Sequence, residues 1–299
     1  MALLKTLTRT QEDIAVIEEL DVLTAHVRSQ ASRLGTQEVR FLVDTYYQMQ
    51  ERRKASANQE RALGESKEPI ALVDYFVGLD TYSEKKIKQM LQAYAESKPD
   101  AAWAMSILGI GPVISAGLAA HIDISMAPTV GHIWRFAGLD PTITWDKGQK
   151  RPWNANLKTL CWKIGESFVK VKNNDKDIYG KVYDMRKKLE EERNEAGLFA
   201  DQAKAKLEKH KIGKGTEAYK AYSKGKLPPA HIHSRAKRYA VKLFLAHYHH
   251  VSYELHHGEA PPKPYVIEHL GHGHYMAPPN WPMSVSYTHL RAHETVLDL

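Results

Sequence analysis

Apolar side chains recur at the three- and four-residue spacing of an α-helix along most of the chain, as in Ile14, Ile17, Leu20 and Leu23. Nowhere do apolar and polar residues alternate over a run long enough for a half-buried strand. This spacing predicts a mostly α fold and argues against any fold built on a sheet. The chain has 299 residues, of which 43% are hydrophobic, so it can bury the core of one large domain or two ordinary ones.

Helix breakers and capping patterns divide the sequence into segments. We expect an N-terminal helical hairpin, a helix-hairpin-helix core and a long helical pair. In chain order, the expected elements are a hairpin over residues 11–61 that bends near Gly35, a breaker over 64–69, a helix from a Thr81–Glu84 capping box to Pro99, a short helix after Gly109–Pro112, a polar hairpin over 140–152, a helix over 154–171, a charged arm over 177–210 with an apolar stripe of Ile178, Val182, Met185 and Leu189, and a last helix over 229–257.

These segments predict a domain organisation. The expected regions are a coiled-coil-like helical region over 1–68, a helix-hairpin-helix domain over 69–175, and a helical extension with a basic C-terminal helix over 176–284. Residues 285–299 read VSYTHLRAHETVLDL, which looks like the translation of a sequencing-library adapter, so we leave them out of the fold argument.

The most specific local motif is the turn Gly109-Ile110-Gly111-Pro112. The glycines permit backbone angles that other residues disfavour, and Pro112 suits the first position of a new helix. A hairpin of this kind leaves free backbone N–H groups that point outward at the positive end of a helix dipole, where a phosphate oxygen can bind. The motif therefore predicts either a DNA-backbone contact or a simple connector between two packed helices.

Charge and cysteine content restrict the partner and the compartment. The net charge is +7, and residues 201–245 hold 12 Lys and Arg against 3 Asp and Glu, which favours an acidic partner over this part of the chain. The one cysteine, Cys161, excludes an internal disulfide, and no apolar run approaches the length of a membrane span. We expect a cytoplasmic protein without a membrane partner.

A stretch after the turn resembles a known family. The GIGP turn, the segment ending in FAGLDP and the helix start NANLKTLCW are similar to the C-terminal domain of insertion-sequence transposases related to the pilin-gene-inverting recombinase. The resemblance covers roughly residues 105–171. It implies DNA transposition and recombination by a mobile element, with an N-terminal RuvC-like nuclease domain of four acidic residues and a serine nucleophile shortly after the GLDP-like turn.

Two departures from that pattern bear on catalysis. A RuvC-like domain needs strands that bring carboxylates to two metal ions, and Asp80 is followed by a helical pattern instead. Between Met126 and Glu166 there is no serine, and the hydroxyls of Thr142 and Thr144 have no evident base in the sequence. The catalytic residues therefore stay unknown, and no cofactor is predicted beyond Mg²⁺ with a nuclease partner. We expect the chain to hold DNA without cutting it.

Two basic segments are further candidates for phosphate contacts. Lys147, Lys150 and Arg151 lie close in sequence to Trp145 and Trp153, which combines positive charge with rings that can stack or serve as core anchors. In the last helix, the candidate phosphate contacts are Arg235, Arg238 and Lys242, opposite an apolar face. A merely solvated basic face is the alternative.

The remaining expectations concern histidines and partners. None of the 16 histidines belongs to a recognisable metal motif, so we expect polar tips on aromatic packing. Possible partners are RNA, a nuclease and, through the long helices, a second copy of the chain. The competing function is a non-enzymatic helical scaffold, in which the apolar stripe of residues 178–189 binds another protein.

Overall fold

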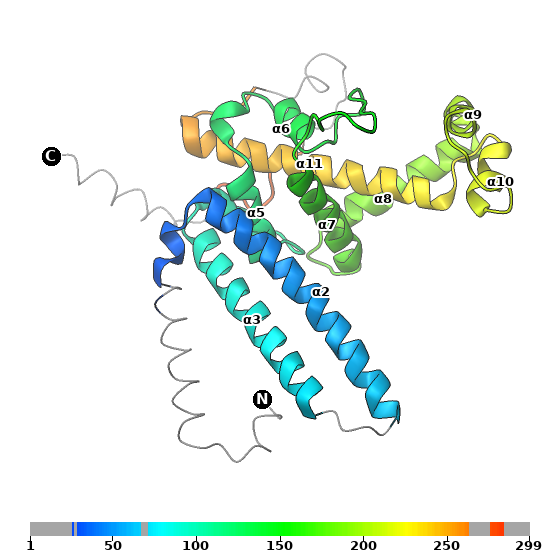
Figure 1. Cartoon of the computed structure of the whole chain (residues 1–299). Coiled ribbons are helices and arrows are strands. Elements are labelled where there is room, and N and C mark those ends of the chain that lie inside the picture. Colours follow the sequence, from blue (N-terminus) through cyan, green and yellow to red (C-terminus); the bar gives the residue numbers. More distant parts are fainter. Residues whose placement is uncertain (1–25, 27–28, 67–70, 263–275, 284–299) are drawn as a thin grey trace. The chain divides into compact units, whose positions relative to one another are not determined.

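A computed structural model describes residue 26 and residues 29–66, 71–262 and 276–283 (Figure 1). The described residues form helices and no strand, which confirms the mostly α fold. They divide into two compact units: unit 1 is the described part of 1–105 with 111–123, and unit 2 comprises 106–110 and the described part of 124–283. Most of the expected first arm of the N-terminal hairpin and all of the adapter-like end lie outside the described residues.

Unit 1 is built on a long antiparallel pair of helices. Its elements are η2 (Ala31–Arg33), α2 (Thr36–Ser66), α3 (Ala71–Glu96), α4 (Pro99–Met105) and α5 (Pro112–His121). Helix α5 contacts both long helices and α4. The core they share consists mainly of Val39, Val43, Tyr46, Ile87, Leu91, Tyr94, Val113, Ala116 and Ala120. The hairpin that the structure describes thus pairs α2 with α3, and Gly35 lies just before α2.

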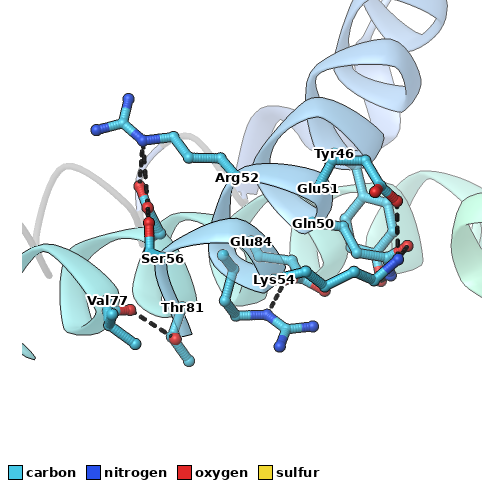
Figure 2. A network of polar contacts seen from close by, with 11 residues as sticks. Tyr46, Gln50, Glu51, Arg52, Lys54, Ser56, Val77, Thr81 and Glu84 are labelled. Atoms are coloured by element: carbon cyan, nitrogen blue, oxygen red, sulfur yellow. Dashed lines mark hydrogen bonds and ion pairs between the residues drawn. The ribbon is translucent and has the colours of Figure 1, made fainter. Parts of the chain in front are cut away.

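The predicted capping box at Thr81 and Glu84 is wrong. Helix α3 begins at Ala71, and the Thr81 hydroxyl donates a hydrogen bond of 2.7 Å to the Val77 carbonyl, as Figure 2 shows. Glu84 accepts a hydrogen bond of 2.6 Å from Arg53 on α2. Packing against α2 outweighs the weak helix propensity of residues 75–80, YFVGLD, so α3 begins well before the expected start at Thr81.

Asp80, weighed above as a metal ligand, has a structural partner instead. Its carboxylate is only 5% exposed and forms an ion pair of 3.0 Å with Arg52 on α2. Ser56 donates to the same carboxylate at 3.3 Å, and Figure 2 shows Arg52 and Ser56 side by side along α2. Asp80 therefore satisfies its charge by joining the two long helices.

Unit 2 is organised around its last helix, which contacts η3, α6, α7 and α8. The elements are η3 (Ile124–Met126), α6 (Val130–Phe136), α7 (Ala155–Val171), α8 (Tyr179–Glu195), α9 (Ala200–Lys209), α10 (Glu217–Ser223) and α11 (Pro229–His257). An aromatic cluster of Phe168, Tyr179 and Phe244 joins α7, α8 and α11, with ring centroids 4.8 to 5.6 Å apart. Helices α9 and α10 pack on each other near the start of α11 (Figure 1).

The predicted helices over 154–171 and 229–257 are confirmed. The Asn154 side chain accepts a hydrogen bond of 2.9 Å from the Leu157 N–H and so begins α7. Pro229 stands in the first turn of α11, and Gly258 ends the helix in the left-handed conformation, with φ of 77°. Local capping chemistry was therefore sufficient to place both helices.

The expected helical arm over 177–210 is confirmed only in its first part: α8 packs along α11, but the chain turns at Gly197, which has φ of 76°, and residues 200–209 form the separate helix α9. The expected apolar stripe is only half used: Val182 is buried, whereas Met185 is 66% exposed and Leu189 is 38% exposed. The buried face of α8 instead carries Tyr183 and Glu190. Apolar spacing alone did not indicate that a carboxylate would face the partner helix.

Candidate nucleic-acid interface

The first half of the glycine turn packs within unit 2. Gly109 has φ of +91°, and a Cβ there would lie 3.2 Å from the Ser167 Oγ and from Val171, so this position requires glycine. The Ser167 hydroxyl donates to the Gly109 carbonyl. Ile110 is 4% exposed, and its N–H donates to the Ile107 carbonyl at 2.9 Å. Packing and turn bonding therefore explain the residue types at Gly109 and Ile110.

The second half of the turn begins helix α5 of unit 1. Gly111 is the N-cap, with φ of −99° and ψ of 177°, and Pro112 stands at the first helical position as predicted. A Cβ at Gly111 would meet nothing within 4 Å. Helices α4 and α5, on either side of the turn, contact each other. Whether this turn binds a phosphate stays a prediction.

The loop between α6 and α7 presents three exposed cations. Lys147, Lys150 and Arg151 are all exposed. The Trp145 indole N–H donates a hydrogen bond of 2.8 Å to the Gln149 carbonyl, and the Arg151 guanidinium lies over the Trp145 ring at 5.3 Å from its centroid. The aromatic ring thus orders the turn that carries the cations.

Trp153 fixes the other end of this loop. A Cβ at Gly138, which has φ of +65°, would lie 2.8 Å from the Trp153 ring and 3.0 Å from Lys158, so the glycine allows the indole to approach the backbone. The Lys158 ammonium lies 3.9 Å from the centroid of Trp153. Trp145 meets Trp153 edge to face at 6.3 Å. Loop and helix α7 therefore form one aromatic and cationic cluster.

Helix α11 adds a third cation to this cluster. Partial burial, followed by the positive charges of Arg151 and Arg238, lowers the pKa of Lys158. The like-charged guanidinium groups therefore lie near enough to disfavour the protonated amine. Residues from the loop, α7 and α11, far apart in sequence, bring their charges to one place.

Lys242 lies one turn further along α11. Its ammonium is 4.0 Å from the centroid of Trp134, and the Trp134 indole N–H donates to the Lys242 carbonyl at 3.1 Å. Burial lowers the pKa of Lys242, and the carboxylate of Asp140 partly opposes that change. Asp140 in turn accepts hydrogen bonds of 2.7 and 2.9 Å from the hydroxyl and the N–H of Thr142. The end of the FAGLDP segment is thus packed beside α11.

Arg235, the third candidate on α11, is engaged in the protein interior. Its Nε donates a hydrogen bond of 2.8 Å to Glu190, whose side chain is fully buried, and another of its nitrogens donates to Gln202 at 3.2 Å. Arg186 and Arg193 also pair with Glu190. Although burial raises the pKa of Glu190, its bonds and charges from Arg235 and Arg186 leave that pKa lowered. We therefore assign Arg235 a structural role.

The threonines considered as nucleophiles are not placed beside a strong base. The Thr142 hydroxyl donates a hydrogen bond to Asp140 in a local turn, and Thr144 is exposed. The two hydrogen bonds from Thr142 lower the pKa of Asp140, which makes this carboxylate a weak base. No group among them is arranged to activate a nucleophile, and the catalytic residues remain unidentified.

Several histidines act as polar tips on aromatic packing, as predicted. The hydrogen-bonded pairs are His247 with Tyr179 at 2.6 Å, His233 with Tyr183 at 2.7 Å, and His231 with Tyr222 at 3.2 Å. Within the part of the chain that the structure describes, no group of three or more His, Cys, Asp or Glu side chains could hold a metal ion. Over the same residues, no helix has both the length and the hydropathy needed to cross a bilayer.

Sequence reasoning missed Lys158 and Trp134. On α7, the Trp162 ring is 59% exposed, and the Lys237 ammonium lies 5.7 Å from its centroid. Lys158 carried a signal that could have been used, because it stands one turn after the Asn154 cap and so lies at the loop end of α7. Trp134 offered no such signal, since only the tertiary fold brings it to Lys242.

Comparison with known proteins adds no relative. No protein-family model matches the chain, and neither a curated protein nor a solved structure is significantly similar to it.

Proposed function

We propose that the protein binds DNA mainly through phosphates, on a surface of unit 2 that we call the basic face. The basic face consists of Lys147, Lys150, Arg151, Lys158, Arg238 and Lys242.

The observation that carries this proposal is the meeting of Arg151, Lys158 and Arg238. Burial, and after it the charges of Arg151 and Arg238, lowers the pKa of Lys158, and among the described residues no carboxylate forms an ion pair with any of the three. Like charges held close together repel each other in the unliganded protein, and a bound phosphate group relieves that repulsion. A surface of this kind favours a polyanion over a neutral ligand.

The tryptophans support the same proposal by fixing the cations. Arg151, Lys158 and Lys242 lie over the rings of Trp145, Trp153 and Trp134, respectively. Side chains held in this way lose less conformational entropy when they meet a ligand than free lysines would. Contacts to phosphate position a protein on DNA without reading base sequence, so we expect little sequence preference from this face.

The resemblance to insertion-sequence transposases favours DNA of a mobile element as the ligand. In this proposal the chain takes part in transposition or recombination by holding DNA, and a partner supplies the nuclease groups, the Mg²⁺ and any guide RNA. The weak base at Asp140 supports a binding role, because Thr142 has no strong base to activate it. Incubation of the purified chain with supercoiled DNA carrying the flanks of its own gene, with Mg²⁺, is expected to leave the DNA intact; reproducible nicking or a covalent adduct would contradict this.

Fluorescence anisotropy with labelled duplex DNA, over a series of salt concentrations, tests the binding proposal. Each phosphate neutralised by the protein lowers the slope of log K against log salt by about 0.9, so four to six contacts predict a slope of roughly −4 to −5. A salt-insensitive affinity, or no binding to duplex DNA at low salt, would remove the proposal.

A scaffold function is the second candidate, and one observation favours it. Met185 and Leu189 on α8 are 66% and 38% exposed, although they belong to the predicted apolar stripe. A protein partner could bury them. The double substitution Met185→Ser and Leu189→Ser separates the two functions: it abolishes capture of a protein partner if the scaffold is correct, and it leaves DNA affinity unchanged if the basic face is correct.

A further inference from the structure

Four side chains of α11 lie on one stripe of that helix. His231, Arg235, Arg238 and Lys242 follow the spacing i, i+4, i+7 and i+11, which places them within a narrow sector of the helix surface. From His231 to Lys242 the helix rises about 16 Å, the length of about five base pairs of duplex DNA. The basic face occupies the Arg238 and Lys242 end of this stripe.

Helix α9 lies at the other end of the stripe and brings a further cation. Arg235 donates to Gln202 of α9 at 3.2 Å and lies over the Phe199 ring at 4.6 Å, so α9 is attached to α11 by two contacts. Tyr222 of α10 meets His231 at 3.2 Å. The position of Lys206 relative to α11 is therefore fixed by packing.

Cations from α9 and α11 act on the same residue of the stripe, His231. Partial burial, followed by the charges of Arg238, Arg235 and Lys206, lowers the pKa of His231. Lys206 and Arg238 thus act on one imidazole from α9 and from α11. Arg238 also acts on Lys158, so Lys206, Arg238 and Lys158 lie in order from α9 to the end of α7 beside the α6–α7 loop, whereas Arg235 between them is paired with Glu190.

We infer that the DNA-binding surface extends from the basic face along α11 onto α9, with Lys206 and His231 contacting the backbone of the same duplex. This inference rests on the proposed function, and it adds the direction in which the DNA-binding surface runs and the length of duplex that it covers. A straight helix that carries cations over several base-pair steps fits the rigid phosphate rows of a duplex better than it fits a flexible single strand.

Charge reversal on α9 tests the extension, with a matched control on the same helix. Lys204 and Lys206 are two residues apart, so their side chains leave α9 on opposite sides, and Lys204 is exposed. With a labelled duplex two helical turns long, Lys206→Glu is expected to weaken binding about tenfold and to make the salt slope less steep by about one. Lys204→Glu is expected to change the affinity less than about twofold.

Proton uptake supplies a second readout. A phosphate beside His231 raises the pKa of the imidazole from its lowered value in the free protein, so binding takes up a proton and the affinity falls as the pH rises from the pKa of the free protein to that of the complex. The Tyr222 hydroxyl, Arg235, Arg238 and Lys206 are the groups that face this imidazole. His231→Gln is expected to remove that part of the pH dependence and to leave the helical circular dichroism signal unchanged.

The outcomes separate the inference from the proposed function. If Lys158→Glu weakens binding and Lys206→Glu behaves like Lys204→Glu, the basic face stands and the extension is wrong. If a single strand of equal length binds as tightly as the duplex, the choice of a duplex is wrong. If neither Lys158→Glu nor Lys206→Glu alters binding, or if no DNA binds, both proposals fail.

Discussion

Glu190 is a buried carboxylate of α8 that joins this helix to α11 through Arg235. Its carboxylate is fully buried and meets guanidinium groups from Arg186, Arg193 and Arg235. A buried carboxylate contributes little net stability when it is paired, but its removal leaves three partly exposed guanidinium groups without their anion. Arg235 is therefore committed to the fold, although the sequence pattern groups it with the DNA-binding candidates.

Replacement of Glu190 by Gln is expected to lower the free energy of unfolding by about 1.5–3 kcal/mol at neutral pH, because hydrogen bonds to a charged group are lost while the partly exposed cations can be hydrated. The pKa of Glu190 is lowered from the ordinary 4.5, so its contribution is present above that pH and is lost as the pH falls through the lower, folded-state value. Urea unfolding of wild type and variant, at neutral pH and near pH 3, measures both effects. Glu191→Gln, an exposed neighbour paired with Lys187, is the control and is expected to cost little.

Gly111 offers a direct test of the glycine turn. Since a Cβ fits there and the residue is the N-cap of α5, Gly111→Asp and Gly111→Ser are both expected to fold with unchanged or slightly higher stability. If the turn contacts a phosphate, the aspartate repels it, and the Gly111→Asp variant is expected to bind DNA much more weakly than the Gly111→Ser variant. Equal affinity of the two variants in anisotropy would show that the turn is a connector.

At the scale of elements, the buried side of α11 packs against α8. It carries aromatic and aliphatic residues, and His247 there meets the Tyr179 hydroxyl of α8 at 2.6 Å and the Met276 carbonyl at 2.8 Å. The carbonyl can only accept, so the imidazole donates to it through Nε2 and accepts from Tyr179 through Nδ1. This arrangement requires a neutral imidazole.

Acid is therefore expected to weaken the contact between α8 and α11. Burial lowers the pKa of His247 from 6.5 to about 4, despite the Met276 carbonyl, so the contribution of His247 is complete above pH 6.5 and decreases down to pH 4. The loss can reach about 3 kcal/mol. His247→Gln keeps one donor and one acceptor without titrating, and thermal unfolding of this variant should depend less steeply on pH than that of wild type. An unchanged pH dependence would contradict the assignment.

The presence and the ends of a helix could be predicted from the sequence where residues near its ends form the caps. Asn154 and Gly258 mark the limits of α7 and α11 by interactions within a few residues, so these predictions are confirmed. Thr81 carried a similar pattern but lies inside α3. Packing against α2 keeps the residues before Thr81, which include Gly78, in the helix. Local rules cannot anticipate that contribution.

The candidate site was predictable only in part, for the same reason. Lys147, Lys150 and Arg151 are adjacent in sequence and could be found there. Their meeting with Lys158 and Arg238 depends on how α7 and α11 pack, as does the use of Arg235 by Glu190. Charge composition over residues 201–245 indicated an acidic partner, but it could not distinguish a cation that binds from one that supports the fold.

At the scale of the whole molecule, the described residues form a helical protein of two compact units, and the cations of the basic face belong to unit 2. The helical class is tested by far-ultraviolet circular dichroism, which is expected to show the minima of α-helix. A spectrum dominated by strand would contradict the fold and with it the placement of every cation in the basic face.

The central claim is that the basic face holds DNA through phosphates. The most direct measurement compares the double variant Lys158→Gln and Arg238→Gln with a control of equal charge change, Lys170→Gln and Lys188→Gln, which alters exposed positions of α7 and α8. In salt-dependent anisotropy with duplex DNA, the first variant is expected to bind at least about tenfold more weakly and to have a salt slope less steep by about two, with the control close to wild type. Equal loss in both variants would show that only net charge matters, and no loss in either would show that DNA is not held on this face.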